Sequence, residues 1–152
     1  MKELARNKKA FFDYEINDTF EAGIVLIGDE VKSARAGNIS LTDAFATVHG
    51  NEIVLTNCYI GQYSHAFDKK TGDFTRRSRT LLLNRKEINR LIGEVSRKGM
   101  TLIPIKMYLN NRGLVKIEIG VAKHKKAHDK KQTLKERDIK RETDRTIKQR
   151  VS

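Results

Sequence analysis

Apolar and polar residues alternate over several short stretches of the chain, and this pattern predicts antiparallel β-strands. Residues 44–49 alternate, meet a Gly-Asn turn at 50–51 and continue into the apolar run EIVLTNCYI at 52–60. Two such runs across a short turn are typical of a β-hairpin. Residues 20–33, which contain GIVLIG followed by DEVKS, predict a further strand with apolar residues on both sides at its centre.

A second hairpin is predicted near the C-terminal end of the apolar part of the chain. Residues 100–109 and 114–122 are its expected strands, and NNRG at 110–113 is its turn. Pro104 is the only proline of the sequence. Proline has no backbone N–H to donate to a neighbouring strand, so we expect Pro104 at an edge or a bulge.

One helix is clearly indicated between the two hairpins. Asn84 is a good N-cap, Glu87 follows three residues later as in a capping box, and Gly99 can end the helix. Its apolar residues recur at the spacing of one helical face. They are Ile88, Leu91, Ile92 and Val95.

Weaker signals predict a shorter helix beginning at Ser40 or Thr42 and another within residues 2–14. Residues 65–79 are polar and irregular, and we expect a mobile loop there. Several short antiparallel strands with one packed helix predict a mainly β protein built as a small closed barrel. The OB-fold is one barrel of this kind, and its surface commonly serves oligonucleotides.

Charge divides the chain into two parts. The 152 residues carry a net charge of +12, of which +7 lies in residues 123–152. We therefore expect a body over residues 1–122 and a basic C-terminal tail over 123–152. The tail has no aromatic residue and too few large apolar residues to form a core, so it is expected to be disordered when free. Those apolar residues are Leu134, Ile139, Ile147 and Val151.

Two interpretations of the tail stay open from the residues alone. It lacks Pro and Gly and is rich in helix formers, and Ile139, Ile147 and Val151 fall on one helical face. These features suit a segment that folds on a partner. The alternative is a solvated charge run that contributes only non-specific attraction.

The surplus of positive charge favours nucleic acid as the partner. An anionic membrane surface is the weaker alternative, because no apolar window is long enough to span a bilayer and the tail lacks large inserting residues. The N-terminal residues have no apolar region of a secretory signal. The single cysteine, Cys58, lies in an apolar run and is expected to be a buried thiol, which suits a reducing cytoplasm.

Enzyme signatures are mostly missing from the sequence. It has no glycine-rich phosphate loop, no nucleophile elbow and no Cys-His pairing. His124 and His128 are four residues apart, but the lysines around them would repel a metal cation. His49 beside a turn is expected to be a surface or strand residue and not a general base. Asp29 and Glu30, adjacent in a predicted strand, would point to opposite faces. We expect no enzymatic activity, no metal and no cofactor.

Two groups of residues suit RNA recognition. Arg76, Arg77 and Arg79 offer guanidinium groups for phosphates or for stacking on unpaired bases. Lys8 and Lys9 lie next to aromatic residues, which either contact RNA or anchor the N-terminal segment to the barrel. A glutamate on such a surface repels phosphate but accepts hydrogen bonds from base amino groups.

Longer motifs carry a resemblance to a known family. They are NKKA at residues 7–10, FEAGIVLIGDEVKSARAG at 20–37, RSRTLLLN at 77–84 and KIEIGVAKHKKAHDKK at 116–131. In this order and spacing they resemble the small protein B family, which binds transfer-messenger RNA (SsrA RNA). The resemblance covers nearly the whole chain.

The resemblance implies an OB-fold-like six-stranded antiparallel barrel with flanking α-helices and a flexible basic tail. It implies a cytoplasmic, non-enzymatic protein, expected as a monomer, that binds the tRNA-like domain of transfer-messenger RNA and promotes its aminoacylation. The protein then delivers this RNA to stalled ribosomes for trans-translation, which rescues the ribosome and tags the nascent peptide for degradation. The implied RNA-binding residues are Asn7, Lys8, Tyr14, Glu21, Arg35, Leu82 and Asn84. Leu82 could equally belong to the core, and Asn84 is already predicted as a helix cap.

The resemblance also implies a role for the tail, which would become helical in the empty mRNA path near the decoding centre. The family pattern there is GKKxxDKR, from which His124 and Lys131 depart in this chain. Lysine lacks the bidentate geometry of arginine, so Lys131 does not offer the same contact to phosphate. The implied ribosome-binding residues are Lys125, Lys126, His128, Asp129, Lys130, Lys131 and Ile147.

Two other functions remain as alternatives. One is a ribosomal or initiation-factor-like OB protein that binds ribosomal RNA without transfer-messenger RNA. The other is a nuclease, which would need acidic metal ligands gathered at one site, whereas the acids of this sequence are dispersed.

Overall fold

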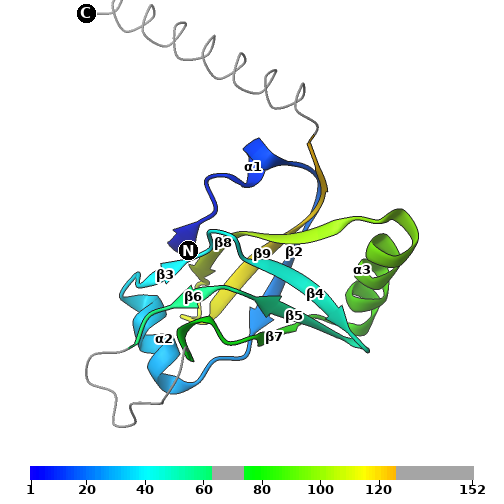
Figure 1. Cartoon of the computed structure of the whole chain (residues 1–152). Helices are drawn as coiled ribbons and strands as arrows, with labels where there is room; N and C mark the ends of the chain where they lie inside the picture. Colours follow the sequence, from blue (N-terminus) through cyan, green and yellow to red (C-terminus); the bar gives the residue numbers. More distant parts are fainter. Residues whose placement is uncertain (63–73, 126–152) are drawn as a thin grey trace, which may run out of the picture.

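The computed structural model describes residues 1–62 and 74–125. Its main feature is a sheet of seven strands, six of which close into an antiparallel ring (Figure 1). In ring order these are β8 (Thr101–Leu109), β4 (Phe45–His49), β5 (Glu52–Thr56), β7 (Arg79–Leu82), β2 (Tyr14–Ile24) and β9 (Val115–His124). The predicted mainly β, closed six-stranded architecture is confirmed at this level.

Both predicted hairpins are present. β4 and β5 pair through His49 and Glu52 around the turn at 50–51, and β8 and β9 pair from Leu109 and Val115 onward. The register of β8 against β9 shifts between Pro104 and Lys106, so Pro104 stands at a bulge as predicted. β9 runs to His124, two residues past the predicted end of the body.

The apolar run at 52–60 forms two strands instead of one. Asn57 adopts a positive φ of 62° and ends β5. The chain resumes as β6 (Tyr59–Ile60), which pairs with β3 (Ile39–Ser40) in a separate two-stranded sheet. The helix predicted from Ser40 or Thr42 is therefore wrong, because Ser40 belongs to this strand pair and Thr42 lies in the turn that follows.

The first 14 residues contain less helix than predicted. β1 (Lys2–Arg6) pairs with β8 outside the ring, and only α1 (Ala10–Asp13) is helical. Asn7 lies between β1 and α1, and its backbone N–H donates to the carbonyl of Ile105 on β8 at 2.7 Å. The N-terminal segment is thereby attached to the bulged part of β8.

The strand predicted over residues 20–33 is wrong in its second half. β2 ends at Ile24, and the helix α2 (Gly28–Arg35) follows. Glu30 decides this outcome, because its carboxylate accepts the backbone N–H of Ile27 at 3.1 Å and so closes the first helical turn. Asp29 and Glu30 therefore lie in a helix, so the strand argument applied to them does not hold.

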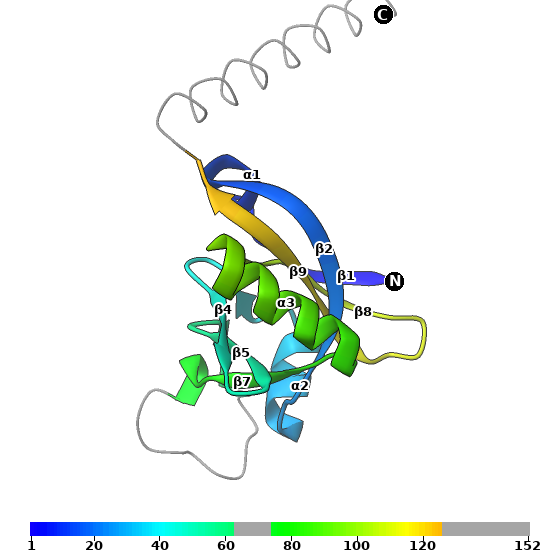
Figure 2. The ribbon, with the colours of Figure 1, turned by 90° about the vertical axis from the view of Figure 1, so that its right-hand side faces the viewer.

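The helix predicted after Asn84 is confirmed as α3 (Arg85–Lys98). Asn84 Oδ1 accepts the backbone N–H of Glu87 at 2.9 Å, and Gly99 ends the helix with a φ of 64°. Leu91 is buried in the core of the ring, with Ile88, Ile92 and Val95 packed against it. Figures 1 and 2 show α2 and α3 on opposite sides of the ring, with α3 laid across one of its ends.

Candidate nucleic-acid interface

One outer surface of the ring lies where β7, β2 and β9 run side by side. Gly23 on β2 pairs with Leu82 on one side and with Lys116 on the other. Leu82 is 57% exposed, so it does not belong to the core. A Cβ at Gly23 would stand 3.3 Å from the Leu82 Cβ and 3.6 Å from the Lys116 Nζ. The glycine therefore leaves a shallow gap between an exposed apolar group and a cation.

Glu21 adjoins this gap on the same outward face of β2. Its carboxylate accepts a hydrogen bond from the Tyr108 hydroxyl, which reaches across β9. Burial, together with the hydrogen bond and negative charge of Glu21, raises the pKa of Tyr108 above its ordinary value of 10. Tyr108 thus remains a hydrogen-bond donor that orients Glu21, whose other lone pairs can accept from base amino groups. We call Glu21, Gly23, Leu82 and Lys116 the β2–β7 surface.

Asn84 lies just beyond this surface, at the start of α3. Its Oδ1 is used by the helix cap, which leaves the amide Nδ2 as a donor. The cap therefore fixes the side chain without using all of its hydrogen-bonding capacity. Asn84 keeps the structural role predicted for it and can still contact a ligand.

Three other predicted residues gather around α1. Asn7 and Tyr14 line a hollow of about 240 Å³, and Lys8 is exposed nearby. Asn7 Nδ2 donates to the carbonyl of Pro104 at 3.1 Å, and the Tyr14 ring lies 4.4 Å from the ring of His124. Tyr14 therefore packs at the end of β9, where the tail begins.

Arg35 belongs to a third place, in the last turn of α2. Its guanidinium donates to the carbonyl of Gly113 at 3.0 Å, which ties α2 to the turn between β8 and β9. The remaining guanidinium N–H groups are exposed and can meet phosphate. The predicted RNA-binding residues thus lie in three neighbourhoods instead of one.

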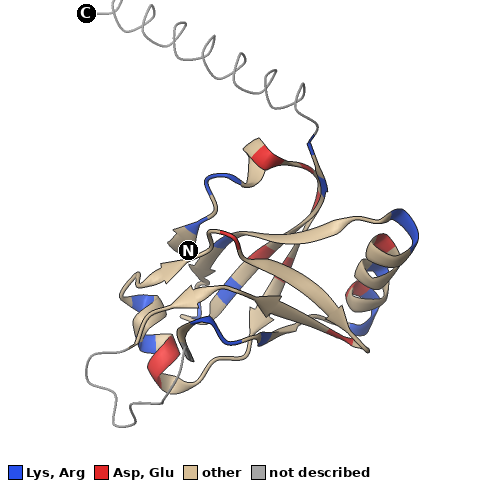
Figure 3. Ribbon diagram, in the orientation of Figure 1, with Lys and Arg blue, Asp and Glu red and all other residues tan. Residues whose placement is uncertain are grey.

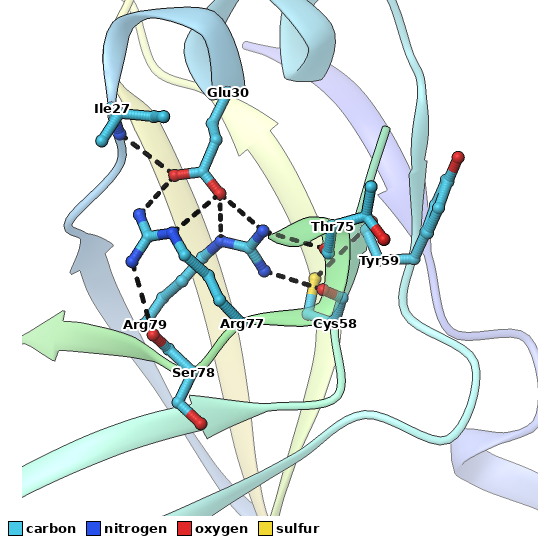
Figure 4. Close-up of polar contacts among 8 residues, drawn as sticks. All are labelled: Ile27, Glu30, Cys58, Tyr59, Thr75, Arg77, Ser78 and Arg79. Atoms are coloured by element: carbon cyan, nitrogen blue, oxygen red, sulfur yellow. Dashed lines mark hydrogen bonds and ion pairs between the residues drawn. The ribbon is translucent and has the colours of Figure 1, made fainter. Parts of the chain in front are cut away.

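The arginine cluster at 76–79 is mostly structural, which contradicts its predicted role in binding phosphates and bases (Figure 4). Arg79 is 1% exposed, and its Nε donates to Glu30 at 2.7 Å. Its other nitrogens donate to the carbonyls of Cys58 and Thr75 at 2.7 and 3.0 Å. Arg77 also bonds to Glu30. The buried acid Glu30 holds Arg79 inside the protein and Arg77 partly buried at its edge. The sequence pattern did not reveal this partner.

The third arginine of the cluster, Arg76, is exposed but also engaged. Its guanidinium donates to the backbone and side-chain oxygens of Asn57 at 3.3 Å and lies 5.5 Å from the centre of the Tyr59 ring. It therefore holds the chain before residue 63 to the chain after residue 73. Stacking on a nucleobase would require Arg76 to leave these contacts.

Cys58 is fully buried, as predicted, and burial raises the pKa of its thiol to about 11. Because the thiolate is the reactive form, the folded protein should react with iodoacetamide at pH 8 at least about tenfold more slowly than the same chain in denaturant. Mass spectrometry of the alkylated fraction over time measures this rate. A folded rate equal to the denatured rate would mean that Cys58 is accessible.

Most predicted tail residues lie outside the described part of the chain. Lys125 is the last described residue, and it is bound to α1: its N–H donates to the carbonyl of Asp13 at 2.9 Å and its Nζ to that of Phe11 at 2.8 Å. The tail therefore leaves the body from a fixed point beside α1. The predicted residues beyond it are Lys126, His128, Asp129, Lys130, Lys131 and Ile147.

Within residues 1–62 and 74–125, no group of three or more His, Cys, Asp or Glu residues is placed to hold a metal ion. In the same ranges, no helix combines the length and apolar character needed to cross a bilayer.

Sequence reasoning missed two residues of the β2–β7 surface, Gly23 and Lys116, and also Tyr108, which orients Glu21. Lys116 and Tyr108 face outward because they alternate with core residues, so the clean alternation of KIEIGV could have pointed to Lys116. Gly23 gave no signal by itself, since its importance depends on the cross-strand neighbours Leu82 and Lys116.

The closed ring and its surface define a small basic β-barrel protein with an exposed patch of apolar, acidic and cationic groups suited to nucleic acid. The family model described as SmpB protein matches residues 4–149. The chain belongs to this family.

Relatives of similar length support the assignment. The SsrA-binding protein of Coprothermobacter proteolyticus is 53% identical over 142 residues, which is 93% of this chain and 94% of the relative. The SsrA-binding protein of Caulobacter vibrioides is 50% identical over 147 residues, or 97% and 95% of the two chains. A solved chain described under "tmRNA-SmpB: a journey to the center of the bacterial ribosome" is 46% identical, with a TM-score of 0.65, and the match covers 80% of this chain and 84% of that one.

Proposed function

We infer that this chain binds SsrA RNA, the transfer-messenger RNA, and acts with it on the ribosome in trans-translation. The observation that carries this inference is full-length membership of the SmpB family together with the exposed β2–β7 surface. An exposed leucine beside a glutamate and a lysine suits unpaired bases and a bent backbone better than it suits a uniform duplex. The surface therefore recognises the tRNA-like domain of SsrA RNA.

Capture of bound RNA tests this function directly. The full-length protein, purified from bacterial cells under mild conditions, should carry SsrA RNA as its most enriched transcript when the bound RNA is sequenced. A chain in which Glu21 is replaced by Lys serves as the control and should lose this enrichment. Recovery of ribosomal RNA alone would instead favour a ribosomal or initiation-factor-like protein.

We propose that the ring is an OB-type barrel and that the protein is not an enzyme and works in the cytoplasm. The closed antiparallel ring with a helix packed across one end supports the first proposal. Membership of an RNA-binding family supports the second. The fully buried, reduced Cys58 and the ribosomal partner fit the third.

We further propose that residues 126–152 serve the ribosome while the body holds SsrA RNA. Changing His128 to Ala should then lower ribosome accommodation at least about tenfold and leave binding of the tRNA-like domain within about twofold. Peptide-tagging assays and filter binding measure the two activities. Equal loss of both would contradict this division of roles.

Truncation gives the matching control for the body. Because β9 runs to His124 and Lys125 bonds to α1, the shortened chain should end at Lys125 and not at Ala122. At moderate salt it should bind the tRNA-like domain nearly as tightly as the full chain. A large loss would mean that the tail is part of the RNA clamp.

A further inference from the structure

The outer side of α3 carries a stripe of cations. Lys86, Arg90, Gly93 and Arg97 follow one another at spacings of four, three and four residues, which places them on one line along the helix. This line faces away from Leu91 and the core. We call these four residues the α3 stripe. Blue segments mark both ends of α3 in Figure 3.

The cations of the α3 stripe are only lightly neutralised. Arg90 pairs with Asp18 at 2.7 Å and lies 5.2 Å from the centre of the Phe20 ring, so it is fixed against β2. In the described part of the chain, Lys86 and Arg97 form no ion pair. The acids of the helix are used elsewhere, Glu87 in the cap and Glu94 with Lys98 at 3.3 Å.

Gly93 at the middle of the stripe has no role inside the protein. It lies within a helix, where glycine is less favourable than alanine by about 1 kcal/mol. No heavy atom lies within 4 Å of the position its Cβ would take, so packing does not require it. It lines an open hollow of about 350 Å³ together with Asn89, Glu94, Arg97 and Lys98. A glycine at such a position allows another molecule to approach the helix backbone closely.

We propose that the α3 stripe binds the ribose–phosphate backbone of SsrA RNA, with the chain of the RNA passing over Gly93. This proposal rests on the proposed function and extends it to a second surface. Lys86 and Arg90 lie about 6 Å apart along the helix axis, and Arg90 and Arg97 about 10 Å apart. Such a row of separated cations suits successive phosphates of one strand.

Position favours SsrA RNA over other polyanions. α3 begins at the residue after Asn84, which borders the β2–β7 surface, and Arg90 is bound to the strand that carries Glu21. An RNA held at the β2–β7 surface can therefore continue along α3, where the acids Asp18 and Glu94 are each paired with a cation. An acidic protein segment is the competing occupant. If the stripe bound such a segment, substitutions in the stripe would not change the affinity for the isolated tRNA-like domain.

Charge substitution tests the proposal with a matched control away from α3. The variant Lys86→Gln with Arg97→Gln removes two cations from the stripe, whereas Lys2→Gln with Arg112→Gln removes two exposed cations from β1 and from the turn between β8 and β9. Binding of the full-length chain to the isolated tRNA-like domain is measured by filter binding over a salt series. The stripe variant should bind at least about tenfold more weakly at about 0.1 M salt and lower the slope of log K against log salt by roughly 1.5. The control should stay within about threefold.

Gly93→Gln separates binding from folding. Glutamine is a better helix former than glycine, so the melting temperature should rise by a few degrees. The added side chain fills the hollow, so RNA binding should weaken at least about fivefold. If Gly93→Gln raises the melting temperature and weakens RNA binding, damage to the fold does not explain the loss of binding.

The results of these experiments distinguish failure of the α3 stripe proposal from failure of the proposed function. If the unchanged chain binds the tRNA-like domain but the stripe and control variants bind alike, the α3 stripe has no role in RNA binding. Wild-type affinity of Gly93→Gln would overturn the close approach over the helix. If the stripe variants impair only ribosome association, the backbone bound there is not that of SsrA RNA. If the unchanged chain fails to bind, the proposed function itself is wrong.

Discussion

Replacing Glu30 by Ala should lower the free energy of unfolding by about 3–5 kcal/mol, because the change leaves the guanidinium of Arg79 buried without its carboxylate. Arg79 is fully enclosed and Glu30 is 5% exposed, so water does not replace the lost partner. Arg77 and the backbone N–H of Ile27 lose an acceptor at the same time. Urea denaturation followed by circular dichroism measures the effect.

An exposed ion pair provides the comparison. Glu3→Ala removes a partner of Arg6 at the surface, where both side chains are largely in water, and should cost less than about 1 kcal/mol. Similar losses for Glu30→Ala and Glu3→Ala would show that the buried network contributes little to stability.

The stabilisation by Glu30 should also depend on pH. Burial alone would raise the pKa of Glu30, but hydrogen bonds from Arg77, Ile27 and Arg79 outweigh it and hold this pKa below 4.5. A carboxyl whose pKa is lower in the folded state stabilises the protein above its unfolded pKa and loses this contribution as the pH falls through the folded pKa. The difference between wild type and Glu30→Ala should therefore be constant near neutral pH and narrow below about 4.5.

Replacing Leu82 by Asp should weaken binding of the tRNA-like domain about 100-fold while leaving the fold intact. The substitution removes an exposed apolar contact at the β2–β7 surface and adds a negative charge where RNA approaches. Because Leu82 is mostly exposed, its loss opens no cavity in the core. Filter binding and thermal melting measure the two quantities.

Phe45→Asp is the matched control for this substitution. Phe45 is also an exposed apolar residue, but it lies on β4, three strands from β2 around the ring. Introducing the same charge there should change RNA affinity by less than about threefold. Phe45 also lines the hollow beside Asn7 and Tyr14. Comparable losses from both variants would therefore point to a general charge effect or to RNA contact at that hollow, and not to recognition at the β2–β7 surface alone.

Elements with local signals were predictable from the sequence. The hairpins around residues 50–51 and 110–113 and the helix between Asn84 and Gly99 each carry their own turn or cap residues. The helix α2 carries its signal in Glu30, but the apolar run before it resembles a strand and gave the wrong prediction. The N-cap of α2 is Ile27, whose side chain makes no cap hydrogen bond, so the polar cap signal that Asn84 provides for α3 is missing there.

Features that depend on distant neighbours were not predictable in the same way. Arg79 looks like a surface cation until Glu30, 49 residues earlier, is placed beside it. Leu82 looks like a core residue in the sequence. In the structure, β7 pairs with β2 so that Leu81 points into the core and Leu82 points outward. The resemblance supplied the expectation that Leu82 binds RNA, and the structure supplied the physical reason that this side chain is accessible.

β9 is the last strand of the ring to be synthesised. β9 pairs with both β2 and β8, so the ring stays open until the last of its strands has been synthesised. Pairs such as Tyr14 with His124 join residues about 110 positions apart, and contacts of this range form slowly. The N-terminal strands must therefore wait with unpaired edges while the rest of the chain is translated, which is the period in which the nascent protein is most prone to aggregate.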